Sequence, residues 1–149
     1  MSTLRLEITT PERVVYTDSV DEIVLPTVQG EIGILPHHVP LMTVLRAGEI
    51  RIKKGGEETS MAVSGGFVEV RPDAVVILAD TAERAEDIDE QRAEEARQRA
   101  HALLEEKQVD QVEFAELSSK IEKELARLKV VRKRRSGHRD RSAGSTPGV

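Results

Sequence analysis

The sequence predicts an all-β N-terminal region, a small sandwich or barrel, followed by an antiparallel hairpin of two C-terminal helices. From residue 4 to residue 80, apolar and polar residues alternate between glycines and prolines, which is typical of short strands joined by turns. After Asp80 the chain has no glycine or proline until Gly137, and its apolar residues repeat every 3.6 residues, as in helices. The predicted parts are residues 1–84, a helical hairpin at 85–132 and a basic, disordered tail at 133–149.

Glycine and proline mark the turns of the N-terminal part. Leu4, Leu6 and Ile8 alternate with polar residues and predict the first strand. The pair Gly55-Gly56 separates "EIRIKK" from "EETSMAV" and predicts a tight hairpin whose turn requires positive φ. Two further breaks, Gly65-Gly66 and Arg71-Pro72-Asp73, separate three more predicted strands.

Two acidic residues predict where the helices begin. Asp87, with Glu90 three residues later, and Asp110, with Glu113, have the spacing of N-caps with reciprocal partners. The helices are then expected at roughly 88–106 and 111–132. Their facing stripes are Ala93, Ala96, Ala100, Leu103 and Leu104 on the first helix and Phe114, Leu117, Ile121, Leu125 and Leu128 on the second. Because alanines bury little apolar area, we expect this hairpin to be held weakly.

Composition excludes several classes of protein. The chain has no cysteine, so disulfides, thiolate metal sites and cysteine nucleophiles are excluded. The longest plainly apolar run, Val75 to Ala79, is far below the roughly 20 residues needed to cross a bilayer. The start "MSTLRLEITT" lacks the pattern of a secretory signal, which favours a cytoplasmic protein. The net charge of −5 conceals a basic end, because residues 127–149 hold eight basic residues and one acidic residue.

Candidate sites for chemistry are few. The sequence has no nucleophile elbow, phosphate-binding P-loop or metal-binding H-E-x-x-H spacing, so we expect no enzyme and no metal site. Neighbouring His37 and His38 would point to opposite sides of an extended chain. Three aromatic residues are too few to stack on nucleic acid, and the basic "RKRR" run is interpreted as a solvated helix end. These features indicate an interaction protein with a movable element. A free-standing sandwich adaptor and a module that binds a small ligand are the alternatives.

Four stretches then indicate a family: "TPERVVY", "VQGEIGILPHHVPLMTVLRAGEIRI", "VSGGFVEVRPDAVVILAD" and "AERAEDIDEQRAEEARQRA". In this order and spacing they resemble the epsilon subunit of the bacterial F-type ATP synthase, from residue 1 to about residue 132. The chain beyond about residue 135 departs from the family's usual end. The resemblance implies a ten-stranded sandwich with two helices and a non-catalytic subunit of the central rotor stalk.

The resemblance also implies partners and a location. The sandwich would bind the gamma subunit and the ring of c subunits, and the helices would reach the alpha and beta subunits when they extend. In that position they would inhibit ATP hydrolysis. The expected location is the cytoplasmic face of the bacterial cell membrane, as a peripheral protein without a membrane span. No nucleic acid is expected as a partner.

Site residues follow from the same resemblance, position by position. It implies c-ring contacts at Glu31, in the loop Gln29 to Gly33, and at His38. Inhibition is assigned to Lys123, Arg127 and Arg132 on the second helix. ATP, with or without Mg²⁺, would bind the folded hairpin as a regulatory ligand, and no catalytic cofactor is expected. The ATP-binding positions are Glu83, Ile88, Asp89, Arg92, Ala93, Arg99 and Arg127, of which Ile88 to Ala93 match an I/L-D-x-x-R-A motif.

The residues themselves support a ligand site on the first helix. Arg92 and Arg99 are seven residues apart, which is ~10.5 Å along a helix and about 20° around it. Their guanidinium groups could therefore bind phosphates together beside a stripe of small alanines. The alternative is that they only pair with Glu95 and Glu106, or with neighbouring residues, along a solvated helix. Lys123 lies where the family has a second nucleotide-binding arginine, and a lysine loses the bidentate geometry of arginine.

Overall fold

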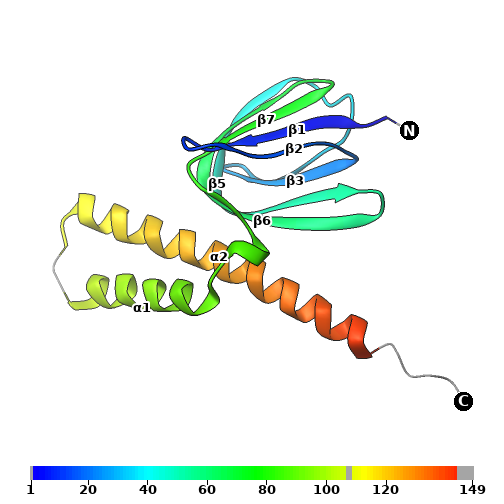
Figure 1. The fold of residues 1–149 in the computed structure, drawn as a ribbon. Helices are drawn as coiled ribbons and strands as arrows, with labels where there is room; N and C mark the ends of the chain where they lie inside the picture. Colours follow the sequence, from blue (N-terminus) through cyan, green and yellow to red (C-terminus); the bar gives the residue numbers. More distant parts are fainter. Residues whose placement is uncertain (1, 107–108, 144–149) are drawn as a thin grey trace, which may run out of the picture.

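The computed structural model describes residues 2–106 and 109–143, with the backbone alone for residues 138–143. A β-sandwich is followed by a helical hairpin that packs beside it (Figure 1). The strands are β1 (Leu4–Thr9), β2 (Val14–Val20), β3 (Glu22–Thr27), β4 (Gly30–Ile34), β5 (Leu41–Lys54), β6 (Glu57–Val70), β7 (Ala74–Ala79) and β8 (Ala82–Arg84). A short 3₁₀ turn, η1 (Ala85–Asp87), leads to α1 (Glu90–Glu106) and α2 (Gln111–Ala143).

The strands form two layers because β5 and β6 contribute to both. Hydrogen bonding follows the order β2-β1-β7-β6-β5-β3-β4, and β8 pairs with β6. One layer holds β2, β1 and β7 with residues 66–70 of β6 and 41–45 of β5. The other holds β4, β3 and β8 with residues 47–54 of β5 and 57–64 of β6. Eight strands therefore supply five segments to each layer, which accounts for the expected number of about ten.

A single apolar core lies between the layers. The predicted alternation is confirmed in β1, where Leu4, Leu6 and Ile8 are buried. Their core partners come from the second layer as well, including Ile23 of β3 and Ile52 of β5. The predicted hairpin at Gly55-Gly56 is also confirmed, since both glycines have positive φ, +58° and +79°, and join Lys54 to Glu57.

Gly65-Gly66 bends a strand and does not end one. The sequence predicted a break between two strands here, but β6 runs through it from Glu57 to Val70. Both glycines have positive φ, +126° and +143°, and the pairing with β5 is interrupted between Leu45↔Gly66 and Ala47↔Ser64. Glycine is required because a Cβ on Gly66 would lie 2.0 Å from the carbonyl oxygen of Leu78. The bend is what lets β6 pass from one layer to the other.

The start of α1 corrects the predicted cap. Asp89, and not Asp87, is the N-cap: its Oδ1 accepts a hydrogen bond from the backbone N–H of Arg92 at 3.1 Å. Asp87 ends the 3₁₀ turn, and Ile88 has an extended backbone that turns its side chain into the protein. Burial of Ile88 therefore moves the helix start two residues along. At α2 the predicted cap is confirmed, because Asp110 Oδ1 accepts from the N–H of Glu113 at 2.8 Å.

α2 is longer than predicted. The helix was expected to end near residue 132, but it continues to Ala143, so residues 133–143 are helical where a disordered tail was expected. The rest of that tail, residues 144–149, lies outside the described residues. No glycine or proline interrupts the helix before Gly137, and several of the extra basic side chains pair with carboxylates.

The two helices pack antiparallel, and α2 lies between α1 and the sandwich (Figure 1). Ala93 and Ala100 of α1 and Leu128 of α2 are buried, as their stripes predicted. Phe114 and Leu125 belong to the same predicted stripe but keep 56% and 50% of their surface exposed. The alanines of α1 are too small to cover them, and α2 instead buries other residues, including Ala126 and Val130.

Gly66→Ala should destabilise the sandwich. The added methyl group meets the Leu78 carbonyl and the backbone has positive φ, so we expect a loss of about 3 kcal/mol in unfolding free energy, measured by denaturant titration. Gly33→Ala is the matched control, because its Cβ would meet only Glu22 Oε1, at 3.6 Å, and we expect a change within about 1 kcal/mol. Equal effects of both substitutions would contradict the steric requirement at residue 66.

Candidate functional site

The junction between hairpin and sandwich contains a three-membered ion cluster. Glu83 comes from β8, and its Oε2 lies 2.7 Å from Nε of Arg127 on α2. Nη1 of Arg127 donates to Oε2 of Glu124, one turn earlier on α2, at 2.9 Å. Burial disfavours the charged guanidinium, whose side chain is 18% exposed, but Glu83 and Glu124 outweigh this and raise the pKa of Arg127. The structure thus brings together two of the predicted ATP-binding residues, Glu83 and Arg127.

Three more of these residues form the start of α1. Ile88 is buried and packs with Ala62, Ala85 and Val130 in a small apolar cluster between β6, η1 and α2. Asp89 provides the N-cap, and Ala93 is fully buried against its neighbours. In this structure all three have structural roles, which fix the position of α1 relative to the sandwich.

Arg92 and Arg99 project from the outer side of α1. The side chain of Arg92 is 84% exposed and pairs with Asp89, Nε to Oδ2, at 3.7 Å. Arg99 is also exposed. Neither pairs with Glu95 or Glu106 among the described side chains, but the Arg92–Asp89 pair is a pairing along the solvated helix of the kind that the alternative predicted. Arg92 is two residues from Glu94, about 200° around the helix, so these arginines lie on the side opposite the carboxylates that face α2.

The predicted inhibitory residues differ in their surroundings. Arg132 pairs with two carboxylates of α1, through Nε to Glu90 Oε1 at 3.2 Å and through Nη2 to Glu94 Oε2 at 3.5 Å. A hydrogen bond from Arg97 lowers the pKa of Glu94, burial opposes this, and Arg132 lowers it further. Lys123 forms no ion pair in the described part of the chain. The sequence did not indicate that Glu90, Glu94 and Glu124 would neutralise the basic residues of α2.

The two predicted c-ring residues lie at opposite ends of β4. Glu31 is the second residue of β4 and pairs with Arg51 of β5, while most of its side chain remains in solvent. His38 lies in the loop after β4, where its Nδ1 is 2.7 Å from the carbonyl oxygen of Val39. Three residues of strand separate Glu31 from the end of β4, about 10 Å. The structure therefore does not place these two side chains in one contact.

The first layer has an exposed apolar face that was not predicted from the sequence. Val44, Phe67 and Leu78 lie opposite one another on β5, β6 and β7 and are all exposed, as is Met42 nearby. They border a groove of about 240 Å³. The uninterrupted apolar run from Val75 to Ala79 was a signal for it, because strands covered on both faces have such runs.

Two findings concern metals and membranes. In residues 2–106 and 109–143 no three or more histidine or acidic side chains are grouped so that they could hold a metal ion. Among the helices described here, none has the length and apolar content that crossing a bilayer requires.

Comparison with known proteins assigns this architecture to a class. Residues 3–85 match the family described as "ATP synthase, Delta/Epsilon chain, beta-sandwich domain". Residues 86–132 match its companion, "ATP synthase, Delta/Epsilon chain, long alpha-helix domain". A sandwich followed by a hairpin of helices is therefore the architecture of ATP synthase Delta/Epsilon chains.

Full-length relatives narrow the class to one family. The ATP synthase epsilon chain of Dehalococcoides mccartyi is 53% identical over 135 residues, which are 91% of this chain and 96% of that one. The epsilon chain of Chloroflexus aggregans is 51% identical over 127 residues, 85% of this chain and 91% of that one. The chain belongs to the ATP synthase epsilon chain family, whose members are non-catalytic subunits of the enzyme. The resemblance inferred from the sequence is confirmed.

Solved structures support the fold. A chain in the structure of the Euglena gracilis mitochondrial ATP synthase, comprising OSCP, F1 and the c-ring, aligns with a TM-score of 0.73. The alignment covers 85% of this chain and 79% of that chain at 23% sequence identity. A chain in the central stalk and c-ring structure of the Tetrahymena thermophila enzyme aligns with a TM-score of 0.53 at 14% identity. At these identities the likeness establishes the shared fold.

Arg127→Ala should weaken the docking of the hairpin on the sandwich. The substitution leaves the largely buried carboxylate of Glu124 without its partner and removes the link to Glu83, so we expect a loss of about 2 kcal/mol. Hydrogen exchange of the amides of α2 checks this, because an undocked helix opens more readily and exchanges faster. Lys129→Ala is the control, because Lys129 is an exposed basic residue of the same helix. The prediction is wrong if both substitutions change α2 exchange equally.

Proposed function

We propose that this epsilon chain is a rotor subunit of the central stalk that helps to couple proton flow to ATP synthesis and restrains ATP hydrolysis through its C-terminal helices. ATP bound to the docked hairpin is the regulatory signal. The observation that carries this proposal is the way the hairpin is held. Its buried contacts come largely from alanines, whereas basic residues of α2 pair with carboxylates of the sandwich and α1. Such an element can undock without exposing a large core.

The sandwich is the part that we assign to the rotor. Its exposed apolar face, Met42, Val44, Phe67 and Leu78, suits a protein partner, because contiguous apolar patches on soluble domains mark interaction sites. We assign this face to the gamma subunit. Glu31 and His38, at the two ends of β4, are assigned to the c-ring, each as a separate contact. The complex would hold the chain peripherally at the cytoplasmic face of the bacterial cell membrane.

The hairpin is the part that we assign to regulation. While it is docked, Arg127 and Arg132 are neutralised by Glu83, Glu124, Glu90 and Glu94. Undocking from the sandwich would release Arg127 from Glu83, and separation of α2 from α1 would release Arg132 from Glu90 and Glu94. Released basic side chains, with Lys123, would then meet acidic surfaces of the alpha and beta subunits by charge complementarity. The same residues thus serve the docked and the extended positions, and the two positions exclude one another.

ATP would favour the docked position. Arg92 and Arg99 are exposed on one edge of α1 and are available to phosphates, with or without Mg²⁺. Arg127 is already paired with Glu83, so a phosphate reaching it would have to share or displace that carboxylate. A ligand that binds the docked form alone stabilises it by mass action, and abundant ATP would therefore relieve inhibition.

ATP should bind the isolated chain through Arg92 and Arg99. We expect calorimetric titration of the full chain to give heat of binding at millimolar ATP, and Arg92→Ala or Arg99→Ala to weaken affinity about tenfold, since each removes a charge-assisted contact. Arg97→Ala is the matched control, because Arg97 lies on the same helix and pairs with Glu94. No binding, or equal losses in all three variants, would refute ATP as the ligand of this edge.

The gamma subunit should be retained by the apolar face. In co-purification of the full chain with gamma, we expect Leu78→Asp to abolish capture, because a charge would be buried within the contact. Val14→Asp is the control: both residues are 55% exposed, but Val14 lies on β2 at the far edge of the same layer. Capture that survives Leu78→Asp would mean that gamma binds elsewhere. Loss of capture with the control alone would point to β2.

Inhibition should depend on the basic residues of α2. We expect the triple substitution of Lys123, Arg127 and Arg132 by alanine to raise ATP hydrolysis by the assembled complex severalfold, because exposed charge pairs are individually weak but act jointly. Arg127 and Arg132 also form ion pairs in the docked hairpin, so their loss affects both positions. Lys123→Ala leaves these ion pairs intact and therefore tests the contacts of the extended position alone. It should raise hydrolysis to a smaller extent. Unchanged hydrolysis by the triple variant, with inhibition present in the parent complex, contradicts the assignment.

A further inference from the structure

Four consecutive basic residues near the end of α2 pair with carboxylates of other elements. Arg132 contacts Glu90 and Glu94 of α1, and Nη1 of Arg135 lies 3.0 Å from Glu90. These four residues, Arg132 to Arg135, are named the basic segment. The matched family domain ends at residue 132, so three of the four lie beyond it.

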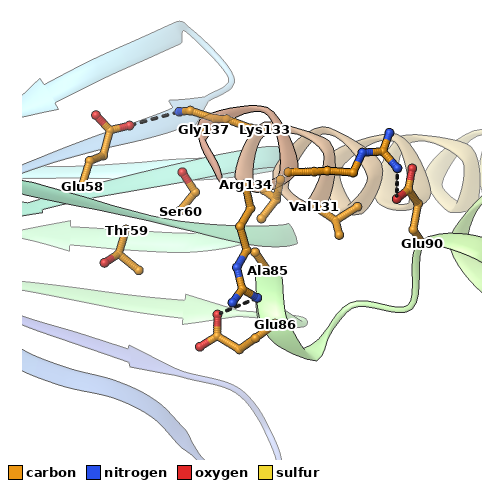
Figure 2. Close-up of a pocket in the computed structure, with 12 residues that line it drawn as sticks. Glu58, Thr59, Ser60, Ala85, Glu86, Glu90, Val131, Lys133, Arg134 and Gly137 are labelled. Carbon is orange, nitrogen blue, oxygen red and sulfur yellow. Dashed lines mark hydrogen bonds and ion pairs between the residues drawn. The ribbon is translucent and has the colours of Figure 1, made fainter. Parts of the chain in front are cut away.

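The other two pairs reach different elements. Lys133 Nζ lies 3.0 Å from Glu58 Oε1 on β6 and 3.3 Å from Glu49 Oε2 on β5. Nη1 of Arg134 lies 3.7 Å from Glu86 Oε2 on η1. Figure 2 shows Lys133 and Arg134 leaving α2 in different directions toward Glu58 and Glu86. The basic segment is therefore tied to the sandwich, to η1 and to α1 together.

Helix geometry makes this set of contacts specific to one position of α2. Consecutive side chains point about 100° apart, so four of them together surround the helix. All four can be paired only where carboxylates are present on several sides. A shift of α2 by one turn would move each basic group about 5.4 Å from its partner and break the pairs at once.

Glu49 adds a requirement for a positive charge. Its side chain is 5% exposed, beneath α2 on the outer face of β5. A buried carboxylate is costly without a counter-charge, and Lys133 provides one at 3.3 Å, closer than Arg51 at 4.0 Å. A docked α2 without Lys133 would cover Glu49 and leave it poorly compensated. Docking and this pairing are thus linked.

We propose that the basic segment is an electrostatic latch that sets the fraction of molecules with the hairpin docked. Each exposed pair is weak and screened by salt, and their combined effect falls as ionic strength rises. The basic segment borders a cleft of about 1040 Å³. Lys133, Arg134 and Arg135 line this cleft and pair with carboxylates that line it too, so we treat the cleft as part of the latch. The consequence for hydrolysis rests on the proposed regulatory function, but the docking equilibrium belongs to the isolated chain.

The test measures docking in the full chain by the distance between two spin labels. The chain has no cysteine, so Thr17→Cys on β2 and Ser119→Cys on α2, both at exposed positions, give two unique labels. We expect one narrow distance distribution at about 50 mM salt and a growing second population at about 1 M. Lys133→Glu should lower the docked-to-undocked ratio about tenfold at low salt.

Two further variants make the result decisive. Lys129→Glu makes the same charge change on the same helix, at an exposed position that forms no ion pair with any described residue, and should leave the distance distribution unchanged. Arg134→Glu should weaken docking, and adding Glu86→Arg should restore it, because this pair is one-to-one. A local loss of helix would not be rescued in this way.

Several outcomes would overturn the latch. It is refuted if Lys129→Glu and Lys133→Glu have equal effects, or if salt leaves the distances unchanged. It is also refuted if the double variant Arg134→Glu with Glu86→Arg fails to restore docking. Measurement of hydrolysis in the assembled complex then separates the two proposals. A latch that operates in the isolated chain while the complex shows no inhibition would refute the regulatory function and leave the latch established.

Discussion

Pairing of positive charges on α2 with carboxylates on the sandwich, η1 and α1 is the interaction on which the docked arrangement depends. The sandwich has its own apolar core between two layers and has no need of the helices to close it. Among the described residues, the apolar cluster between hairpin and sandwich is small, with Ala62, Ala85, Ile88 and Val130 as its buried members. Apolar burial of this size cannot alone fix the position of a long helix. Ion pairs supply the remaining specificity, and they are also what a change in partner or salt alters first.

Much of the fold could be predicted because its determinants are local. Alternation predicted the buried side of β1, paired glycines predicted the turn at Gly55-Gly56, and Asp110 was identified as an N-cap from its spacing to Glu113. The errors arose where tertiary contacts outweigh local signals. Burial of Ile88 moved the cap from Asp87 to Asp89, and the close approach of Gly66 to Leu78 made a predicted break into a bend.

The site was predictable to a smaller extent, for a related reason. Family positions such as Glu83 and Arg127 are in contact, although they are 44 positions apart in the sequence and no periodic pattern connects them. The partner of Lys133, Glu49, is 84 residues away, and nothing in the strand around Glu49 distinguishes it from a solvent-facing carboxylate. Long-range ion pairs depend on how two elements pack against each other. The residues around each partner in the sequence do not indicate this packing. The same limit explains why the helix was expected to end at residue 132.

The parallel pairing of β1 with β7 constrains the order of events during synthesis. β1 can pair with β2 as soon as the ribosome has released the first twenty or so residues, but its other neighbour ends only at Ala79. Until then the N-terminal strand keeps one open edge, and an open edge is where chains join one another wrongly. Residues 80–143 emerge afterwards, so the hairpin arrives at a sandwich that is ready to receive it. A ribosome that stalls before residue 79 has emerged would therefore leave a chain prone to aggregation, whereas a delay after β7 has emerged would not.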